Sequence, residues 1–123
     1  MSISPLVRPA ESGDLDALVS MWRDFMDFHA ARDPEFAITA ASDAVRREFL
    51  EAKLREPDAF VLLAIVEGQA AGYVLGEARS RPPVFAAARF GLITDLYVAP
   101  GRRRSGLGRR LLGKASRRAQ RLK

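Results

Sequence analysis

The sequence contains no cysteine and a single histidine, His29, among its 123 residues. The lack of cysteine excludes disulfides, thiolate metal ligands and a cysteine nucleophile, and one histidine excludes a multi-histidine site, so we expect no metal. The longest apolar run, Ala59 to Val66, is too short to cross a membrane, and the N-terminus lacks the apolar core of a signal peptide. These absences predict one cytoplasmic domain, residues 1–123, that does not contact membranes.

Acidic residues are also missing from one part of the sequence. Residues 100–123 contain ten Lys or Arg and no Asp or Glu, whereas residues 1–99 contain ten Lys or Arg and fifteen Asp or Glu. The net charge of +5 therefore comes entirely from the C-terminal block. Such a block attracts the phosphates of a nucleic acid, a membrane or a small anionic cofactor, and charge alone does not distinguish these partners.

Hydrophobic spacing and turn residues predict the order strand, helix, helix, three strands, helix. The predicted elements are a strand from Ile3 to Pro9, a helix capped by Ser12 that runs to about Ala31, a helix capped by Ser42 that ends before Pro57, a hairpin of strands 59–66 and 71–79, a strand from Arg89 to Val98 and a helix from Ser105 onward. The two early helices are expected to pack side by side.

The strand from Arg89 to Val98 has two mostly apolar faces. Strict alternation places Phe90, Leu92, Thr94, Leu96 and Val98 on one face, and Gly91, Ile93, Asp95 and Tyr97 on the other. Apolar residues on both faces are typical of a central strand.

The loop after this strand, RRSGLG at residues 103–108, opens the last helix. The N-terminus of a helix offers unpaired N–H groups and a positive dipole end, so it binds anions. Gly106 and Gly108 let a ligand approach the backbone, and the arginines at 102–104 can bind phosphate in a fork. The loop lacks the Lys-Ser or Lys-Thr of a Walker A motif, and it comes too late for a dinucleotide fingerprint. A diphosphate fits this arrangement of donors and positive charge.

The segment ITDLYVAP at residues 93–100, followed by R-x-x-G-x-G at Arg103 to Gly108 and by Leu111-Leu112, resembles the strand, loop and helix of the GNAT acetyltransferase superfamily. The resemblance implies an α+β, three-layer fold in which a mostly antiparallel sheet is flanked by helices. It also implies an acetyl-CoA-dependent N-acetyltransferase, in which a small-molecule or peptide amine attacks the thioester directly. A homodimer is expected, and nucleic acid is not.

The resemblance assigns roles to individual residues. The pantetheine arm of coenzyme A is expected on the backbone of Leu96, Tyr97 and Val98, and the Val98 N–H or its neighbour would be the oxyanion donor. Asp95 is the candidate general base. The pyrophosphate is expected on the loop formed by Arg103, Arg104, Ser105, Gly106, Leu107 and Gly108.

Members of the superfamily continue beyond this helix with further strands and a helix, which usually supply a tyrosine as general acid. The resemblance therefore predicts that C-terminal elements are missing, completed by a longer chain or a neighbouring subunit, and it assigns no general acid. A basic nucleic-acid-binding module and a catalytically inactive coenzyme-binding or dimerising fragment stay open as alternatives. Four apolar side chains, Trp22, Phe25, Met26 and Phe49, fit either the core or one wall of an acceptor pocket, and His29 fits a structural or substrate-edge role.

Overall fold

The elements of the computed structural model, which describes residues 5–86 and 88–122, follow the predicted order. They are β1 (Leu6–Pro9), α1 (Leu15–Ala30), α2 (Ser42–Arg55), β2 (Ala59–Val66), β3 (Gln69–Ser80), β4 (Arg89–Val98) and α3 (Leu107–Leu122), with short 3-10 turns at Ser12–Asp14, Pro34–Phe36 and Pro100–Arg102. The start of the predicted first strand, Ile3 and Ser4, lies outside the described residues.

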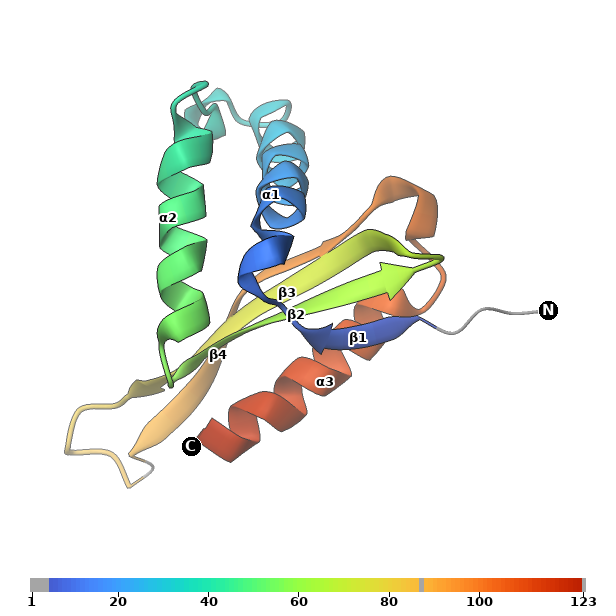
Figure 1. The fold of residues 1–123 in the computed structure, drawn as a ribbon. Helices are drawn as coiled ribbons and strands as arrows, with labels where there is room; N and C mark the ends of the chain where they lie inside the picture. Colours follow the sequence, from blue (N-terminus) through green and yellow to red (C-terminus); the bar gives the residue numbers. More distant parts are fainter. Residues whose placement is uncertain (1–4, 87, 123) are drawn as a thin grey trace.

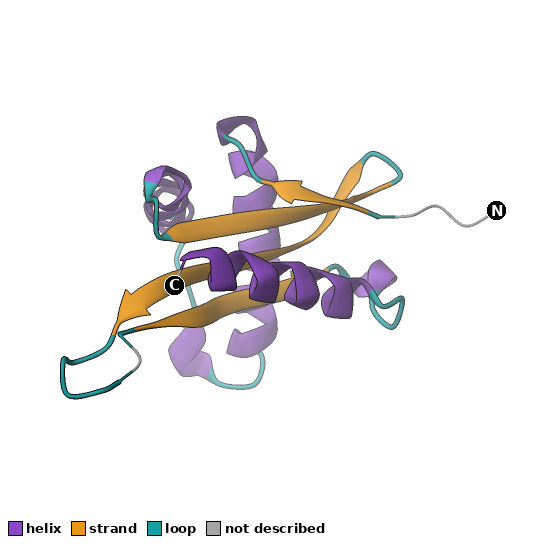
Figure 2. Ribbon diagram, turned by 90° about the horizontal axis from the view of Figure 1, so that it is seen from below, coloured by secondary structure: helices purple, strands orange, loops and turns teal. Residues whose placement is uncertain are grey.

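Three layers form around one antiparallel sheet. The strands lie in the order β1-β2-β3-β4, and each pairs with its neighbour antiparallel. Helices α1 and α2 stand side by side on one face, and α3 crosses the other face (Figure 1). Figure 2 shows α3 lying along the underside of the strands. The predicted α+β three-layer fold is confirmed.

Each face of the sheet carries its own apolar layer. Between the sheet and the helix pair, Leu18, Leu50 and Tyr73 are fully buried. Beneath the sheet, α3 presents Leu107, Leu111, Ala115 and Ala119 at four-residue intervals, so one stripe of the helix is buried. Its remaining surface carries the basic residues. The sheet is therefore held from both sides.

Strand β4 departs from the prediction in two ways. It is the edge strand of the described sheet and not a central one; both of its faces are apolar because helices cover both faces of the sheet. Its alternation is also broken, since Asp95 pairs with Leu75 but Ile93 pairs with Gly76, which leaves Thr94 as an extra residue in a β-bulge. Consequently Ile93 packs towards α3, whereas Asp95 and Tyr97 face α1 and α2.

The two predicted serine caps are wrong. Asp14, not Ser12, closes the turn before α1, because its carboxylate accepts from the Glu11 N–H at 2.8 Å and pairs with Arg8. Ser42 is the first residue of α2, and its hydroxyl accepts from the Thr39 N–H at 3.1 Å, upstream of the helix. Ser12 thus lies inside the turn that precedes α1, and the Ser42 hydroxyl bonds to the connecting loop.

No helix in the described part of the chain combines the length and the apolar character needed to cross a bilayer. The cytoplasmic location stays a prediction.

Candidate functional site

The free edge of β4 presents backbone groups that have no partner strand among the described residues. The Ala99 N–H donates to the Ala71 carbonyl of β3 at 2.8 Å, so alternation turns the N–H and C=O of Val98 and Leu96 towards the free edge. The Tyr97 carbonyl, in contrast, points at Gly72 of β3. Of the three residues predicted to bind pantetheine through their backbone, Leu96 and Val98 therefore face outward and Tyr97 does not.

The loop from Arg103 to Gly106 continues from this edge into α3. Arg104 and Gly106 have positive φ values of 65° and 85°. Among the described residues, no acceptor receives a hydrogen bond from the backbone N–H groups of residues 103–109. A hollow of about 370 Å³ beside the loop is lined by Pro5 and by Ser105, Gly106, Leu107, Arg109 and Arg110. A row of unpaired donors at a helix N-terminus is suited to an anion.

The arginines around the loop are not equivalent. Arg102 pairs with Glu67 at 3.3 Å. The Arg103 Nε donates to the Val98 carbonyl at 2.9 Å, which fastens the loop to the edge of β4. Within residues 5–86 and 88–122, neither Arg103, Arg104, Arg109 nor Arg110 forms an ion pair with an acid. Their positive charge is therefore uncompensated where the unpaired N–H groups gather, which favours a phosphate ligand.

A cavity of about 300 Å³ joins the end of β4 to α1, and we refer to it as the β4 cavity. It is lined by Phe25, Phe28 and His29 of α1, by Leu96, Tyr97 and Val98 of β4, and by Arg103. The ring of His29 stands edge-on to Phe25 with centroids 4.6 Å apart. Four of the residues predicted to bind coenzyme A, Leu96, Tyr97, Val98 and Arg103, thus lie beside aromatic side chains of α1. These side chains can cover the apolar part of a pantetheine arm.

Asp95 lies at the centre of a polar cluster under α2. Its Oδ2 accepts from Arg46 Nη2 at 2.6 Å and from the Tyr73 hydroxyl at 2.8 Å, while no described residue donates to Oδ1. The side chains of Arg46 and Asp95 are 14% and 12% exposed. Burial, and then the charge of Asp95, raise the pKa of Tyr73, so the phenol stays protonated and donates.

Arg46 and Tyr73 did not emerge from the sequence as functional residues. A signal for Arg46 exists, because Ser42, Val45, Arg46 and Phe49 recur at helical spacing and place a charge within an apolar face. Tyr73 carries no such signal, since it sits inside an apolar strand.

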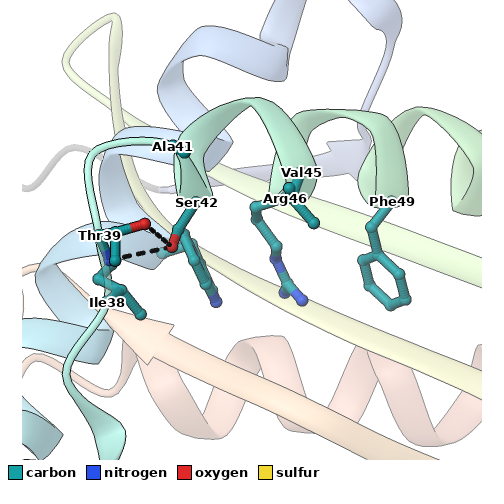
Figure 3. Close-up of a pocket in the computed structure, with 8 residues that line it drawn as sticks. Ile38, Thr39, Ala41, Ser42, Val45, Arg46 and Phe49 are labelled. Atoms are coloured by element: carbon teal, nitrogen blue, oxygen red, sulfur yellow. Dashed lines mark hydrogen bonds between the residues drawn. The ribbon is translucent and has the colours of Figure 1, made fainter.

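A second cavity, the α1–α2 cavity, lies between the two helices and measures about 400 Å³ (Figure 3). Its lining residues are Trp22, Ile38, Thr39, Ala41, Ser42, Val45, Arg46 and Phe49. Arg46 points from α2 into this space beside the ring of Phe49 (Figure 3). Of the four side chains that fitted either core or pocket wall, Trp22 and Phe49 line this cavity and Phe25 lines the β4 cavity.

Comparison with solved structures places this architecture among acetyltransferases. An aminoglycoside 6'-N-acetyltransferase from Acinetobacter haemolyticus shares 21% identity over 94% of this chain and 72% of its own, with a TM-score of 0.74. A predicted acetyltransferase from Clostridium acetobutylicum, solved with acetyl-CoA, shares 20% identity over 96% of this chain and 75% of its own, with a TM-score of 0.74. A GCN5-related N-acetyltransferase from Ralstonia eutropha shares 27% identity over 96% of this chain and 78% of its own, with a TM-score of 0.73.

Sequence comparison identifies the family. Among curated proteins, no sequence matches this chain significantly. Residues 18–123, however, match the acetyltransferase (GNAT) family, and this stretch contains most of α1, all of α2 and α3, and three of the strands. The chain thus belongs to the acetyltransferase (GNAT) family, whose members are acetyl-CoA-dependent N-acetyltransferases.

Proposed function

We propose that this chain transfers the acetyl group of acetyl-CoA to a primary amine by direct attack of the amine on the thioester. The observation that carries the proposal is two sets of backbone N–H groups that follow one another along the chain. The N–H groups of Leu96 and Val98 face the free edge of β4, and those of residues 103–109 donate to no acceptor among the described residues. A pantetheine arm needs hydrogen bonds along its length and a pyrophosphate needs donors at its end. The edge of β4 offers groups for the pantetheine arm, and the loop that follows offers donors for the pyrophosphate.

The chain's own residues divide the chemistry between them. The outward N–H of Val98 is the proposed donor to the oxygen that gains charge when the nitrogen attacks the carbonyl carbon. Asp95 is the proposed base, because its Oδ1 is not engaged by a described residue and can take the ammonium proton directly or through water. The nitrogen–carbon bond then forms and the carbon–sulfur bond breaks. Coenzyme A leaves as the thiolate, which takes up the second proton lost by the nitrogen.

Coenzyme binding is tested by isothermal titration with coenzyme A. Replacing Gly106, whose φ is 85°, with valine should distort the loop and weaken binding at least about tenfold, because a β-branched residue is strained there. Gly101→Ala is the matched control, since a Cβ at Gly101 meets no atom within 4 Å. Equal affinities for the two variants would contradict the proposed loop site.

Acetyl transfer is tested separately by the release of free thiol from acetyl-CoA with a panel of amines. Asp95→Asn should lower kcat by about 10² or more while coenzyme A affinity stays within about twofold, because general base catalysis contributes on that scale. Transfer at the normal rate would exclude Asp95 as the base. Coenzyme binding with no transfer to any amine would identify an inactive coenzyme-binding protein.

The structural relatives support a small acceptor. One is named as an aminoglycoside acetyltransferase, and another, meta-AAC0020, was solved in complex with sisomicin. We propose that the acceptor of this chain is likewise a small-molecule amine. The homodimer implied by the family stays a prediction, and the mass of the protein in solution tests it.

A further inference from the structure

The α1–α2 cavity has an unusual lining for a site that must accept an amine. The ring of Trp22 from α1 forms one wall. The others are Ile38 from the connecting loop and Val45 and Phe49 from α2 (Figure 3). Among the described residues that line it, Arg46 is the one charged side chain, and no Asp or Glu takes part. A cavity of about 400 Å³ has room for a ligand about the size of an aromatic amino acid. Its lining favours an apolar body and one negative charge.

Arg46 has hydrogen-bonding capacity that the chain leaves unused. Its guanidinium carbon lies 4.7 Å from the ring centre of Phe49 and 5.3 Å from that of Trp22, so aromatic faces hold it in place. Within the described residues it donates one hydrogen bond, from Nη2 to Asp95. Its Nε is buried and has no partner. Its Nη1 donates to no described residue either, and a carboxylate is the acceptor that a guanidinium binds best.

We infer that the α1–α2 cavity binds the acceptor, and that this acceptor is a small amine with an apolar body and a carboxylate, as in an aromatic or branched α-amino acid. The inference rests on the proposed function and names its substrate class. A polycationic acceptor would bring like charge to Arg46, and its further ammonium groups would find no Asp or Glu among the residues that line the cavity. The chemistry of this site therefore differs from that expected for an aminoglycoside.

The same guanidinium connects the cavity to the proposed base. Nη2 of Arg46 holds Asp95 Oδ2, while the remaining nitrogens are free of partners among the described residues. In an α-amino acid one carbon separates the carboxylate from the amine. A carboxylate bound by Arg46 thus carries its amine to the neighbourhood of Asp95, whose Oδ1 is available.

Fluorescence of Trp22 tests the inference without catalysis, because it is the single tryptophan of the chain and lines the cavity. We would titrate the protein with L-phenylalanine, 2-phenylethylamine, glycine and sisomicin. L-phenylalanine should change the emission saturably. Loss of the carboxylate in 2-phenylethylamine, or of the apolar body in glycine, should each weaken binding at least about tenfold. Equal binding of L-phenylalanine and 2-phenylethylamine, or tighter binding of sisomicin, would overturn the inference.

A charge placed in the cavity provides a second test. Val45 is 68% exposed and lines the cavity, so Val45→Glu should fold normally, weaken L-phenylalanine about tenfold and improve 2-phenylethylamine. Ala44→Glu is the matched control, because Ala44 is exposed on the same helix and faces a different hollow, beside Asp43 and Arg47. Identical titrations for the two variants would refute the assignment.

Titration with coenzyme A separates this inference from the proposed function. Binding of L-phenylalanine by a protein that does not bind coenzyme A would support the cavity and refute the transferase. Coenzyme binding together with thiol release by sisomicin, and none by L-phenylalanine, would support the transferase and refute the substrate class.

Discussion

The contact between Gly72 of β3 and the end of β4 provides the sharpest test of the site's architecture. A Cβ built at Gly72 would lie 2.6 Å from the Tyr97 carbonyl oxygen, 3.2 Å from Leu111 Cδ1 and 3.4 Å from Val98 Cα. The nearest atom belongs to the backbone, and Leu111 is fully buried, so neither can turn aside. Gly72→Ala must therefore push β4 away from β3, at the peptide where the proposed coenzyme edge begins.

The expected loss of stability follows from the general cost of adding atoms to a closely packed interior. Adding a methyl group to a closely packed interior costs about 1–3 kcal/mol, and at roughly 4 °C per kcal/mol for a domain of this size the melting temperature should fall by about 4–12 °C. Affinity for coenzyme A should fall as well, because the Val98 N–H and C=O move together with the strand.

Thermal unfolding by circular dichroism and isothermal titration with coenzyme A measure the two effects. Gly13→Ala is the control, because a Cβ at Gly13 meets no atom within 4 Å, and its melting temperature should stay constant or rise slightly. A Gly72→Ala protein that melts within about 1 °C of the parent and binds coenzyme A equally well would show that β3 and β4 are not packed as described.

Two further predictions concern ion pairs. Removing Arg46 (Arg46→Gln) should lower the free energy of unfolding by about 1–3 kcal/mol, because the partly buried Asp95 loses its counter-charge. Arg47→Gln, whose partner Asp16 is 90% exposed, should cost less than about 1 kcal/mol in urea unfolding. Similar losses for the two variants would contradict the partial burial of the Arg46–Asp95 pair. The hydrogen bond from Arg8 lowers the pKa of Asp14 below its ordinary value of 3.8. The ionised Asp14 therefore stabilises the folded protein above pH 3.8, and this contribution is lost as the pH falls through the lowered pKa. Asp14→Asn should lower the free energy of unfolding by about 1 kcal/mol at neutral pH. It should also reduce the fall in melting temperature at low pH, measured by thermal unfolding at pH 2–7. An unchanged fall would exclude this pair as a source of acid sensitivity.

Local patterns predicted the elements well, because helices and strands are set by residues near one another in the sequence. The spacing of Leu107, Leu111, Ala115 and Ala119 is enough to define the buried stripe of α3. Contacts between distant residues were not accessible in this way. Arg46 and Asp95 stand 49 positions apart, and nothing around Asp95 indicates that an arginine of α2 will pair with it. The serine caps also failed, because Asp14 closes the turn before α1 and the Ser42 hydroxyl accepts from the Thr39 N–H.

The bulge at Thr94 decides which layer of the molecule carries the polar cluster. Ile93 packs towards α3, and uninterrupted alternation would turn Asp95 in the same direction, into an apolar layer where α3 presents Leu107, Leu111 and Ala115. One extra residue turns Asp95 to the opposite face instead, where Arg46 and Tyr73 donate hydrogen bonds to its carboxylate. A carboxylate buried without partners would be strongly unfavourable, so the bulge and the Arg46–Asp95 pair depend on each other. The bulge cannot be read from the alternation of β4, because its position is set by the register with β3.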